Sequence, residues 1–265
     1  MSVTESLPSV RRLRLPGAEG FVPWLVPLAI LLIWQAASVA GLVPVRVLPA
    51  PSDVARAGWR LLLSGELAQN IWVSFWRAGI GFLIGGGIGF AFGLANGLSQ
   101  LSAKLTDTTL QMVRNIPHLA LIPLVILWFG IGETSKILLI FLACFAPVAL
   151  STRAGVLSAS HDQIHAARAL GASRAQVLRH VVIPAAMPEI LIGLRIGMGV
   201  GWTTLVAAEM VAAQAGLGQL VLNASNFLRT DVVVMGILVI GLFATLFELG
   251  LRGLERVLVP WKGQS

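Results

Sequence analysis

The feature that most limits how this chain can fold is a series of long apolar runs. A helix needs about 20 apolar residues to cross the hydrocarbon layer of a membrane. Six runs approach or reach that length: Phe21 to Ala40, Ala78 to Leu98, Leu110 to Phe129, Ile137 to Thr152, Pro188 to Ala212 and Val232 to Leu251. The fourth run is short, and the third contains Arg114 and His118. The pattern predicts an all-α, polytopic membrane protein with about six transmembrane helices.

Composition excludes a water-soluble globular domain. Hydrophobic residues make up 56% of the chain and charged residues 12%, whereas soluble domains carry roughly 25% charged residues. The net charge of +7 fits contact with anionic lipid head groups, so we expect membrane lipid and no nucleic acid as a partner. Cys144 is the only cysteine, which excludes an intrachain disulfide framework and a thiolate metal cluster. We expect no metal site.

Basic residues around the runs predict the orientation, because cytoplasmic loops are enriched in lysine and arginine. A cytoplasmic N-terminus places eleven of them inside: Arg11, Arg12, Arg14, Lys104, Arg153, Arg168, Arg174, Arg179, Arg252, Arg256 and Lys262. It places five outside: Arg46, Arg56, Arg60, Lys136 and Arg229. Arg77, Arg114 and Arg195 lie near or within runs and are not counted. Both termini and the loop 153–187 are therefore predicted to be cytoplasmic.

The same pattern predicts the division of the chain. Residues 1–20 form a cytoplasmic N-terminal segment, residues 21–251 a single transmembrane domain, and residues 252–265 a cytoplasmic tail. The first run is longer than the 7 to 15 apolar residues of a cleaved signal, so it is interpreted as an uncleaved anchor. Outside the membrane, residues 52–63 are predicted to form a surface helix after a proline-rich crossing.

The loop between the fourth and fifth runs contains a predicted helical hairpin, residues 160–184. Ser160 and Ser173 are each followed three residues later by glutamine, which is the spacing of a capping box at a helix start. Gly171 suits the left-handed residue that ends the first helix. Pro184 lacks a backbone donor and is expected to discourage continuation of the second helix.

Apolar residues of the hairpin fall on one side of each predicted helix. They are Ile164, Ala167 and Leu170 in the first helix, and Val177, Leu178, Val181 and Val182 in the second. Arg168, Arg174 and Arg179 remain available for solvent or for acidic groups. Two interpretations are open at this point: a docking element for a partner, or an ordinary cytoplasmic loop whose arginines fix the topology.

Glycine recurs at every fourth position of the second run: Gly81, Gly85, Gly89, Gly93 and Gly97. Small residues at this spacing make a smooth helix face that lets another helix approach closely. We favour a helix-packing seam over a face along which a neighbouring helix slides or a pore narrows.

Polar residues within the fifth run are candidates for a translocation pathway, because such residues are costly in a membrane. Arg195 and Glu209 lie fourteen positions apart, roughly 21 Å along a helix, so they cannot pair directly. Arg195 is expected to reach toward the cytoplasmic surface. Glu209 is expected to face a water-filled cavity, with Trp202, Thr203 and Thr204 between the two charges. Interface anchoring is the alternative for both charges.

Signals for an enzyme are weak. The stretch GIGETSK at residues 130–136 lacks the spacing of a phosphate-binding loop, so we interpret it as a turn between two runs. The chain contains no HExxH sequence and no GxSxG sequence. We expect no catalytic residue in this chain.

The hairpin sequence HAARALGASRAQVLRHVVIP resembles the EAA loop of the membrane-spanning subunits of bacterial ABC importers. Ala166, Ala167, Gly171 and Pro184 match the family pattern, and Val181 and Ile183 are conservative replacements. His165 stands where the family has a leading glutamate, which removes an acidic contact. The resemblance implies that these seven residues couple the chain to an ATP-binding subunit.

The resemblance covers nearly the whole chain from Phe21 onward. LPAPSDV, IPHLALIPLVILWFGIGETSKILLI and PAAMPEILIGLRIGMGVGWTTLVAAEM are similar to permeases of the nitrate, sulfonate and taurine branch, and most similar to aliphatic sulfonate permeases. It implies a type I (MetI-like) importer fold in a bacterial inner membrane. The implied partners are a second copy of the chain, two ATP-binding subunits that hold ATP and Mg, and an extracytoplasmic solute-binding protein. A secondary transporter and a membrane scaffold without transport remain the alternatives.

Overall fold

Each of the six predicted runs forms helix in the computed structural model, which describes residues 22–261. In chain order the α-helices are α1 (Val22–Val39), α2 (Pro51–Leu63), α3 (Glu66–Leu98), α4 (Gln100–Asn115), α5 (Ile122–Phe129), α6 (Glu133–Leu157), α7 (His161–Ala169), α8 (Arg174–Val177), α9 (Ile183–Ala212), α10 (Leu217–Asn226) and α11 (Thr230–Leu258). A 3-10 turn, His118–Leu121, precedes α5, and a π-helical turn, Leu178–Val182, joins α8 to α9. No strand occurs between residues 22 and 261, so the predicted all-α class is confirmed.

The number of membrane-crossing helices differs from the predicted six. Four helical stretches are long and apolar enough to cross a membrane: α3, α6, the continuous stretch Arg174–Ala212, and α11. A fifth crossing is possible if α4 and α5 count as one bent span. The apolar part of α1, Trp24–Val39, is shorter than these. Among the described residues, the structure therefore supports four or five of the six predicted spans, and every predicted run is helical.

The third predicted run is broken instead of straight. α4 ends at Asn115, and the chain turns by 84° before the helical stretch His118–Phe129. Ile116, which precedes Pro117, has an extended backbone (φ −73°, ψ 121°). A residue before proline is sterically pushed out of the helical region, which explains the break.

The glycine face of α3 lies against α6. A Cβ atom built on Gly85 would lie 2.7 Å from the carbonyl oxygen of Phe141, and one on Gly89 would lie 2.7 Å from the carbonyl oxygen of Phe145. Gly93 meets the carbonyl oxygen of Ala149 in the same way, whereas Gly81 and Gly97 pack on the side chains of Ile140 and Val156. The five glycines thus form a seam at which two backbones come too close for any side chain.

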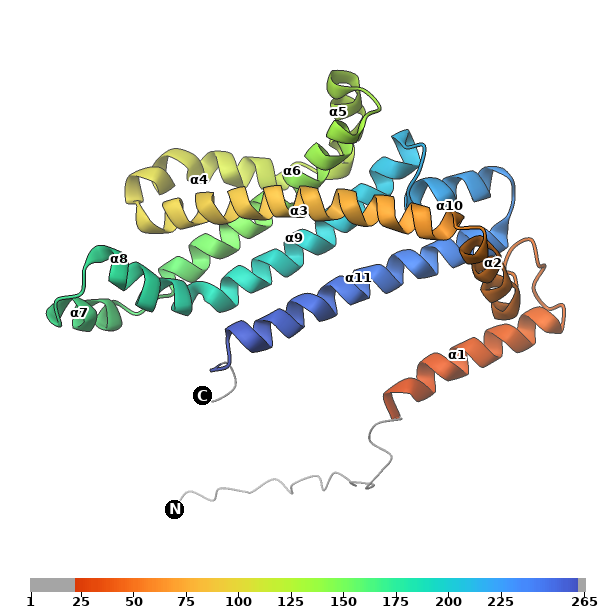
Figure 1. Cartoon of the computed structure of the whole chain (residues 1–265), viewed down its shortest axis with the longest axis horizontal. Coiled ribbons are helices and arrows are strands. Elements are labelled where there is room, and N and C mark those ends of the chain that lie inside the picture. Colours follow the sequence, from red (N-terminus) through yellow and green to blue (C-terminus); the bar gives the residue numbers. More distant parts are fainter. Residues whose placement is uncertain (1–21, 262–265) are drawn as a thin grey trace, which may run out of the picture.

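A second set of glycines brings α9 against the other side of α6. Gly193 packs on Ser151, and Gly197 and Gly201 pack on Cys144. The Cys144 thiol is completely buried and donates to the carbonyl oxygen of Gly197 at 3.2 Å. α6 therefore lies between α3 and α9 at the centre of the bundle (Figure 1).

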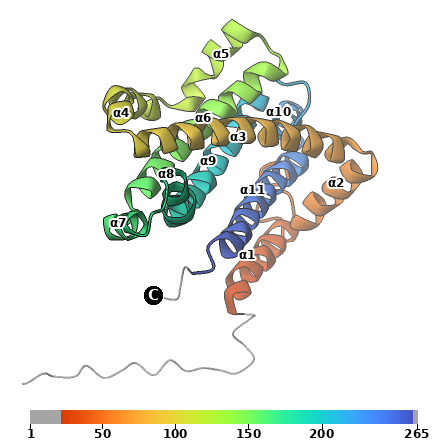
Figure 2. The ribbon, with the colours of Figure 1, turned by 60° about the vertical axis from the view of Figure 1, so that its left-hand side comes forward.

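The bundle has two ends with different elements. α7, α8 and the end of α11 lie at one end, while α2, α10 and the start of α11 lie at the other (Figures 1 and 2). α2 confirms the predicted surface helix. α1 stands beside the bundle and is joined to the α2 region by the Trp34 ring N–H, which donates to the carbonyl oxygen of Pro49 at 3.1 Å.

The structure describes part of the predicted C-terminal tail but none of the predicted N-terminal segment. α11 continues to Leu258, so the first part of the predicted 252–265 tail is helical. The predicted N-terminal segment, residues 1–20, lies outside the described residues.

Candidate functional site

The predicted hairpin exists, and its turn is defined by Gly171. This residue has a left-handed backbone (φ 85°), as the sequence predicted. Its N–H donates to the carbonyl oxygen of Arg168 at 2.9 Å, and the Ala172 N–H donates to that of Ala167 at 3.0 Å. These two bonds form the Schellman motif, which satisfies the last carbonyls of α7 and fixes the direction of the turn.

Only one of the two predicted capping boxes forms. The Ser173 hydroxyl accepts a hydrogen bond from the Gln176 N–H, and the Gln176 side chain accepts one from the Ser173 N–H at 2.8 Å. Ser160 also precedes a helix, yet its side chain makes no capping bond, so that prediction was wrong. The SxxQ spacing therefore permits a capping box but does not require one.

Pro184 does not end the second helix, which corrects the prediction. α8 continues through the π turn directly into α9, giving one helical stretch from Arg174 to Ala212. Proline lacks the N–H that an α-helix would bond to the carbonyl four residues earlier. The π turn just before Pro184 widens the helix at the place where that bond is missing. The hairpin is thus joined rigidly to a membrane helix.

The apolar side of the hairpin packs on the bundle. Val177 and Val182 are buried against Val156, Ala159 and Ala186. The other predicted apolar residues, Ile164, Ala167, Leu178 and Val181, are half-buried around this cluster.

Leu170 departs from the expected pattern, because 89% of its surface is exposed at the tip of the hairpin. Its position next to Gly171, where the chain turns back, carries it off the packed side. Leu170 is therefore accessible to a partner.

The seven candidate coupling residues occupy two surroundings. His165, Ala166 and Gly171 are exposed, and Ala167 is half-buried. Val181, Ile183 and Pro184 are half-buried where the hairpin enters α9. The first group is accessible to a partner, and the second joins the hairpin to the bundle.

A buried charge cluster lies at the opposite end of the same bundle. The carboxylate of Glu209 on α9 is completely buried. It accepts hydrogen bonds from Arg77 Nη1 at 2.9 Å, from Ser74 Oγ at 2.8 and 2.9 Å, and from the Gly218 N–H at 3.0 Å. The expectation that Glu209 faces a water-filled cavity was therefore wrong, because protein donors occupy both of its oxygens.

Arg77 connects this carboxylate to a second one. Its Nε and Nη2 donate to the two oxygens of Glu133 at 2.6 Å each, in the two-pronged geometry typical of arginine and carboxylate. Its Nη1 also donates to the carbonyl oxygen of Ala215 at 2.6 Å. The guanidinium thereby ties together α3, the start of α6, and the loop between α9 and α10.

Polar groups of α3 hold that loop in place. The Asn70 side chain accepts a bond from the Gly216 N–H at 2.7 Å, and the Ser74 hydroxyl accepts one from the Leu217 N–H at 2.8 Å. Gly216 has φ 128°, and a Cβ atom on it would collide with the Glu209 carboxylate. Only glycine fits there.

Sequence reasoning missed Arg77, Ser74 and Glu133. Arg77 was set aside as a charge near a membrane boundary, although its side chain is only 4% exposed. The rule that charges in membrane helices have partners would have singled out Arg77 together with Glu209. Nothing in the sequence marks Ser74 or Glu133.

Arg195 is half-buried and pairs with two carboxylates of a neighbouring helix. It contacts Glu248 at 3.1 Å and Glu255 at 3.5 Å, both on α11. As predicted, it does not pair with Glu209.

The candidate pathway residues do not share one surface. Trp202, Thr204 and Glu209 are buried, whereas Thr203 is exposed. The indole N–H of Trp202 donates to the carbonyl oxygen of Ile240 on α11 at 3.2 Å. Their role in a pathway stays a prediction.

Comparison with known proteins decides the family. Residues 84–260, which include four of the five seam glycines, the hairpin and Glu209, match the family described as "Binding-protein-dependent transport system inner membrane component". The chain belongs to this family. It is a permease, the membrane subunit of a transport system.

Curated relatives are similar over most of the permease. It is 49% identical to the taurine transport system permease protein of Escherichia coli (strain K12) over 89% of this chain and 88% of the relative. It is 44% identical to the putative aliphatic sulfonates transport permease protein of the same organism, over 90% and 91%. A nitrate import permease protein of Synechococcus elongatus is 32% identical over 85% and 86%.

Solved structures show the same fold at lower identity. The inward-facing MetNI methionine ABC transporter matches with a TM-score of 0.60 at 21% identity, over 76% of the permease and 98% of that chain. An amino acid ABC transporter matches with a TM-score of 0.58 at 19% identity, over 76% and 96%. The expected MetI-like permease fold is confirmed.

Proposed function

We propose that this permease forms the translocation pathway of an ATP-driven importer for a small organic sulfonate. The relatives above are named for taurine and for aliphatic sulfonates, and both kinds of solute carry a sulfonate group. The observation that carries the proposal is the hairpin: a rigid knob with an exposed apolar tip, built on the same continuous helix as a membrane crossing.

The proposed assembly contains two copies of the chain, two cytoplasmic ATP-binding subunits and one extracytoplasmic solute-binding protein. ATP and Mg are bound by the ATP-binding subunits, and this chain needs no cofactor. Residues 160–184 face the cytoplasm in this proposal, as do both termini. The basic residues Arg168, Arg174 and Arg179 around the hairpin support this orientation.

Coupling follows from how the hairpin is built. Leu170 and the exposed residues around it dock in a groove of the ATP-binding subunit, as apolar helix surfaces do in helix-in-groove binding. When nucleotide closes the two ATP-binding subunits, each draws its hairpin along. The stretch Arg174–Ala212 transmits that movement into the membrane, because it is one continuous helical stretch.

The pathway is proposed to run along the open face of α9. Ile196, Gly199, Thr203 and Met210 are exposed on this helix at intervals that place them on one side. Trp202, Thr204 and Glu209 lie behind that face. Trp202 bonds α11 and Glu209 bonds α3, whereas the Thr204 hydroxyl donates to the carbonyl oxygen of Val200 within α9. The second copy of the chain is proposed to close the pathway opposite α9.

Transport in proteoliposomes tests the proposal. Chain and ATP-binding subunit are reconstituted with the solute-binding protein encoded beside them, and uptake of labelled taurine, an alkanesulfonate and nitrate is compared with and without ATP. ATP-dependent uptake of a sulfonate supports the proposal. Uptake that follows an ion gradient without ATP would indicate a secondary transporter, and no uptake of any solute would indicate a scaffold.

Gly171→Val tests separately whether the hairpin transmits movement to the membrane helices. Valine is strained at φ 85°, so the turn should distort and uncouple ATP hydrolysis from uptake while the membrane helices stay folded. Gly250→Val on α11, where the added atoms meet nothing within 4 Å, is the matched control. Unchanged uptake by the Gly171 variant would contradict transmission of movement through the hairpin.

A further inference from the structure

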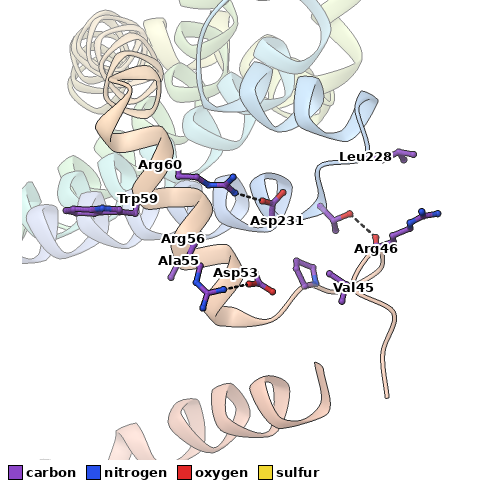
Figure 3. Close-up of a pocket in the computed structure, with 11 residues that line it drawn as sticks. Val45, Arg46, Asp53, Ala55, Arg56, Trp59, Arg60, Leu228 and Asp231 are labelled. Atoms are coloured by element: carbon purple, nitrogen blue, oxygen red, sulfur yellow. Dashed lines mark hydrogen bonds and ion pairs between the residues drawn. The ribbon is translucent and has the colours of Figure 1, made fainter. Parts of the chain in front are cut away.

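At the end of the bundle opposite the hairpin, arginines surround a hollow of about 900 Å³. Arg56 and Arg60 come from α2, Arg46 from the loop before it, and Asp231 from the start of α11 (Figure 3). We refer to this surface as the arginine hollow. Resting on the proposed function, we propose that it docks an acidic surface of the extracytoplasmic solute-binding protein.

The walls of the hollow are held in place before any partner arrives. Arg60 pairs with Asp231 at 3.2 Å, which joins α2 to α11. The Thr230 hydroxyl donates to the carbonyl oxygen of Arg46 at 2.8 Å, which joins the loop to the same helix (Figure 3). A preformed surface loses little conformational entropy on binding.

The charge of the hollow is positive and only partly balanced. Asp53 pairs with Arg56 at 3.0 Å, and Asp231 pairs with Arg60. Within residues 22–261, Arg46 at the rim and its neighbour Arg229 form no ion pair, and both are exposed. Two positive charges are thus left for an acidic partner.

The position of these arginines argues for a protein partner over lipid. Extracytoplasmic loops are normally poor in arginine, and the strongly anionic leaflet is the cytoplasmic one. Four arginines gathered on the outer end are therefore not explained by topology or by lipid attraction. Arginine is, in contrast, enriched in protein interfaces, where it pairs with carboxylates.

An exposed apolar residue lies at the rim of the hollow. Leu228 is the one non-glycine residue with positive φ (55°) in the described part of the chain, and 85% of it is exposed. Leu228 and Arg46 both point away from the helices in Figure 3. The Leu228 N–H donates to the carbonyl oxygen of Ser225 at 3.0 Å and the Arg229 N–H donates to that of Ala224 at 2.8 Å, so the positive φ belongs to the turn that ends α10. The turn presents the leucine outward at the rim, where a partner can bury it.

Binding of the solute-binding protein encoded beside the chain, measured on the permease–ATPase complex in lipid nanodiscs, tests the proposal. Arg46→Glu should weaken binding by about tenfold or more, because it reverses an interfacial charge. Leu228→Gly, which relieves the backbone and removes the apolar contact, should weaken it as well. Lys104→Glu on α4, an exposed charge outside the hollow, is the matched control. Raising the salt concentration should weaken binding of the solute-binding protein to the wild-type permease more than its binding to the Arg46→Glu variant.

A charge swap gives the sharpest result. If an aspartate or glutamate of the solute-binding protein meets Arg46, changing it to arginine should restore binding to Arg46→Glu and not to Lys104→Glu. The proposal is overturned if both hollow variants bind like wild type. It is also overturned if Arg46→Glu changes only binding to phosphatidylglycerol nanodiscs or only self-association of the chain.

Uptake measurements distinguish a wrong docking surface from a wrong proposed function. If wild-type proteoliposomes import a sulfonate with ATP and the hollow variants import it equally well, only the docking surface is wrong. If the wild type imports nothing, the proposed function fails first.

Discussion

Arg77 and Glu209 form an ion pair at 2.9 Å although they are 132 residues apart in the sequence. Their side chains are 4% and 0% exposed. Each also reaches a further element: Arg77 bonds Glu133 at the start of α6, and Glu209 bonds the Gly218 N–H of α10. Four helices are therefore fixed to one another at the end of the bundle that carries the arginine hollow.

Glu209→Ala should destabilise the permease strongly. It leaves the buried Arg77 without its inner partner, and breaking a buried pair costs about 3–5 kcal/mol. Denaturant unfolding in mixed micelles, followed by tryptophan fluorescence, measures the change. Arg252→Ala, which removes an exposed pair with Glu248, should cost only about 0–1 kcal/mol. Equal losses for the two variants would contradict a special role of the buried pair.

Gly85→Leu should separate α3 from α6, because the new side chain meets the Phe141 carbonyl at the seam. Overpacking of this kind costs about 1–3 kcal/mol or more. Gly87→Leu lies two positions away on the same helix and meets nothing within 4 Å. The yield of folded protein after gel filtration should fall for the first variant and stay near wild type for the second. A similar yield for both would argue against the seam.

The two serines of the hairpin should differ on replacement by alanine. Ser173→Ala removes an observed capping bond and should destabilise the start of α8 by about 1 kcal/mol. Ser160→Ala removes no capping bond, so its effect should be within about 0.5 kcal/mol. Hydrogen exchange of the Gln176 amide should accelerate only in the first variant. Faster exchange in both would mean that α7 and α8 depend on each other more than their contacts suggest.

Leu170→Asp should abolish assembly with the ATP-binding subunit and leave the permease itself stable. The side chain is 89% exposed, so it contributes almost nothing to the fold. Val177→Asp, at a buried position of the same hairpin, should instead destabilise the permease. Co-purification with the ATP-binding subunit and thermal unfolding of the isolated chain separate the two effects. Normal co-purification of the Leu170 variant would show that the ATP-binding subunit docks on another surface of the permease.

Local features of the fold followed from the sequence alone. A helix forms its backbone hydrogen bonds between residues close together in the sequence, so a long apolar run is enough to predict one. Each of the six predicted runs is helical in the structure. The left-handed Gly171 and the capping box at Ser173 depend on neighbouring residues and were also predicted. Pro184 was misjudged because its effect depends on whether the preceding turn can widen, which the residue type does not reveal.

The charge cluster shows the limit of such reasoning. The sequence determined that charges lie in apolar helices and therefore need partners, since an unpaired charge in a membrane is too costly to persist. Which partners they find was decided only by the tertiary structure. The glycine seams set how closely α3, α6 and α9 approach, and that approach brings Arg77, Glu133 and Glu209 to one point. The same packing leaves Leu170 outside the core, because the direction of the turn at Gly171, and not the apolar character of leucine, sets where that side chain points.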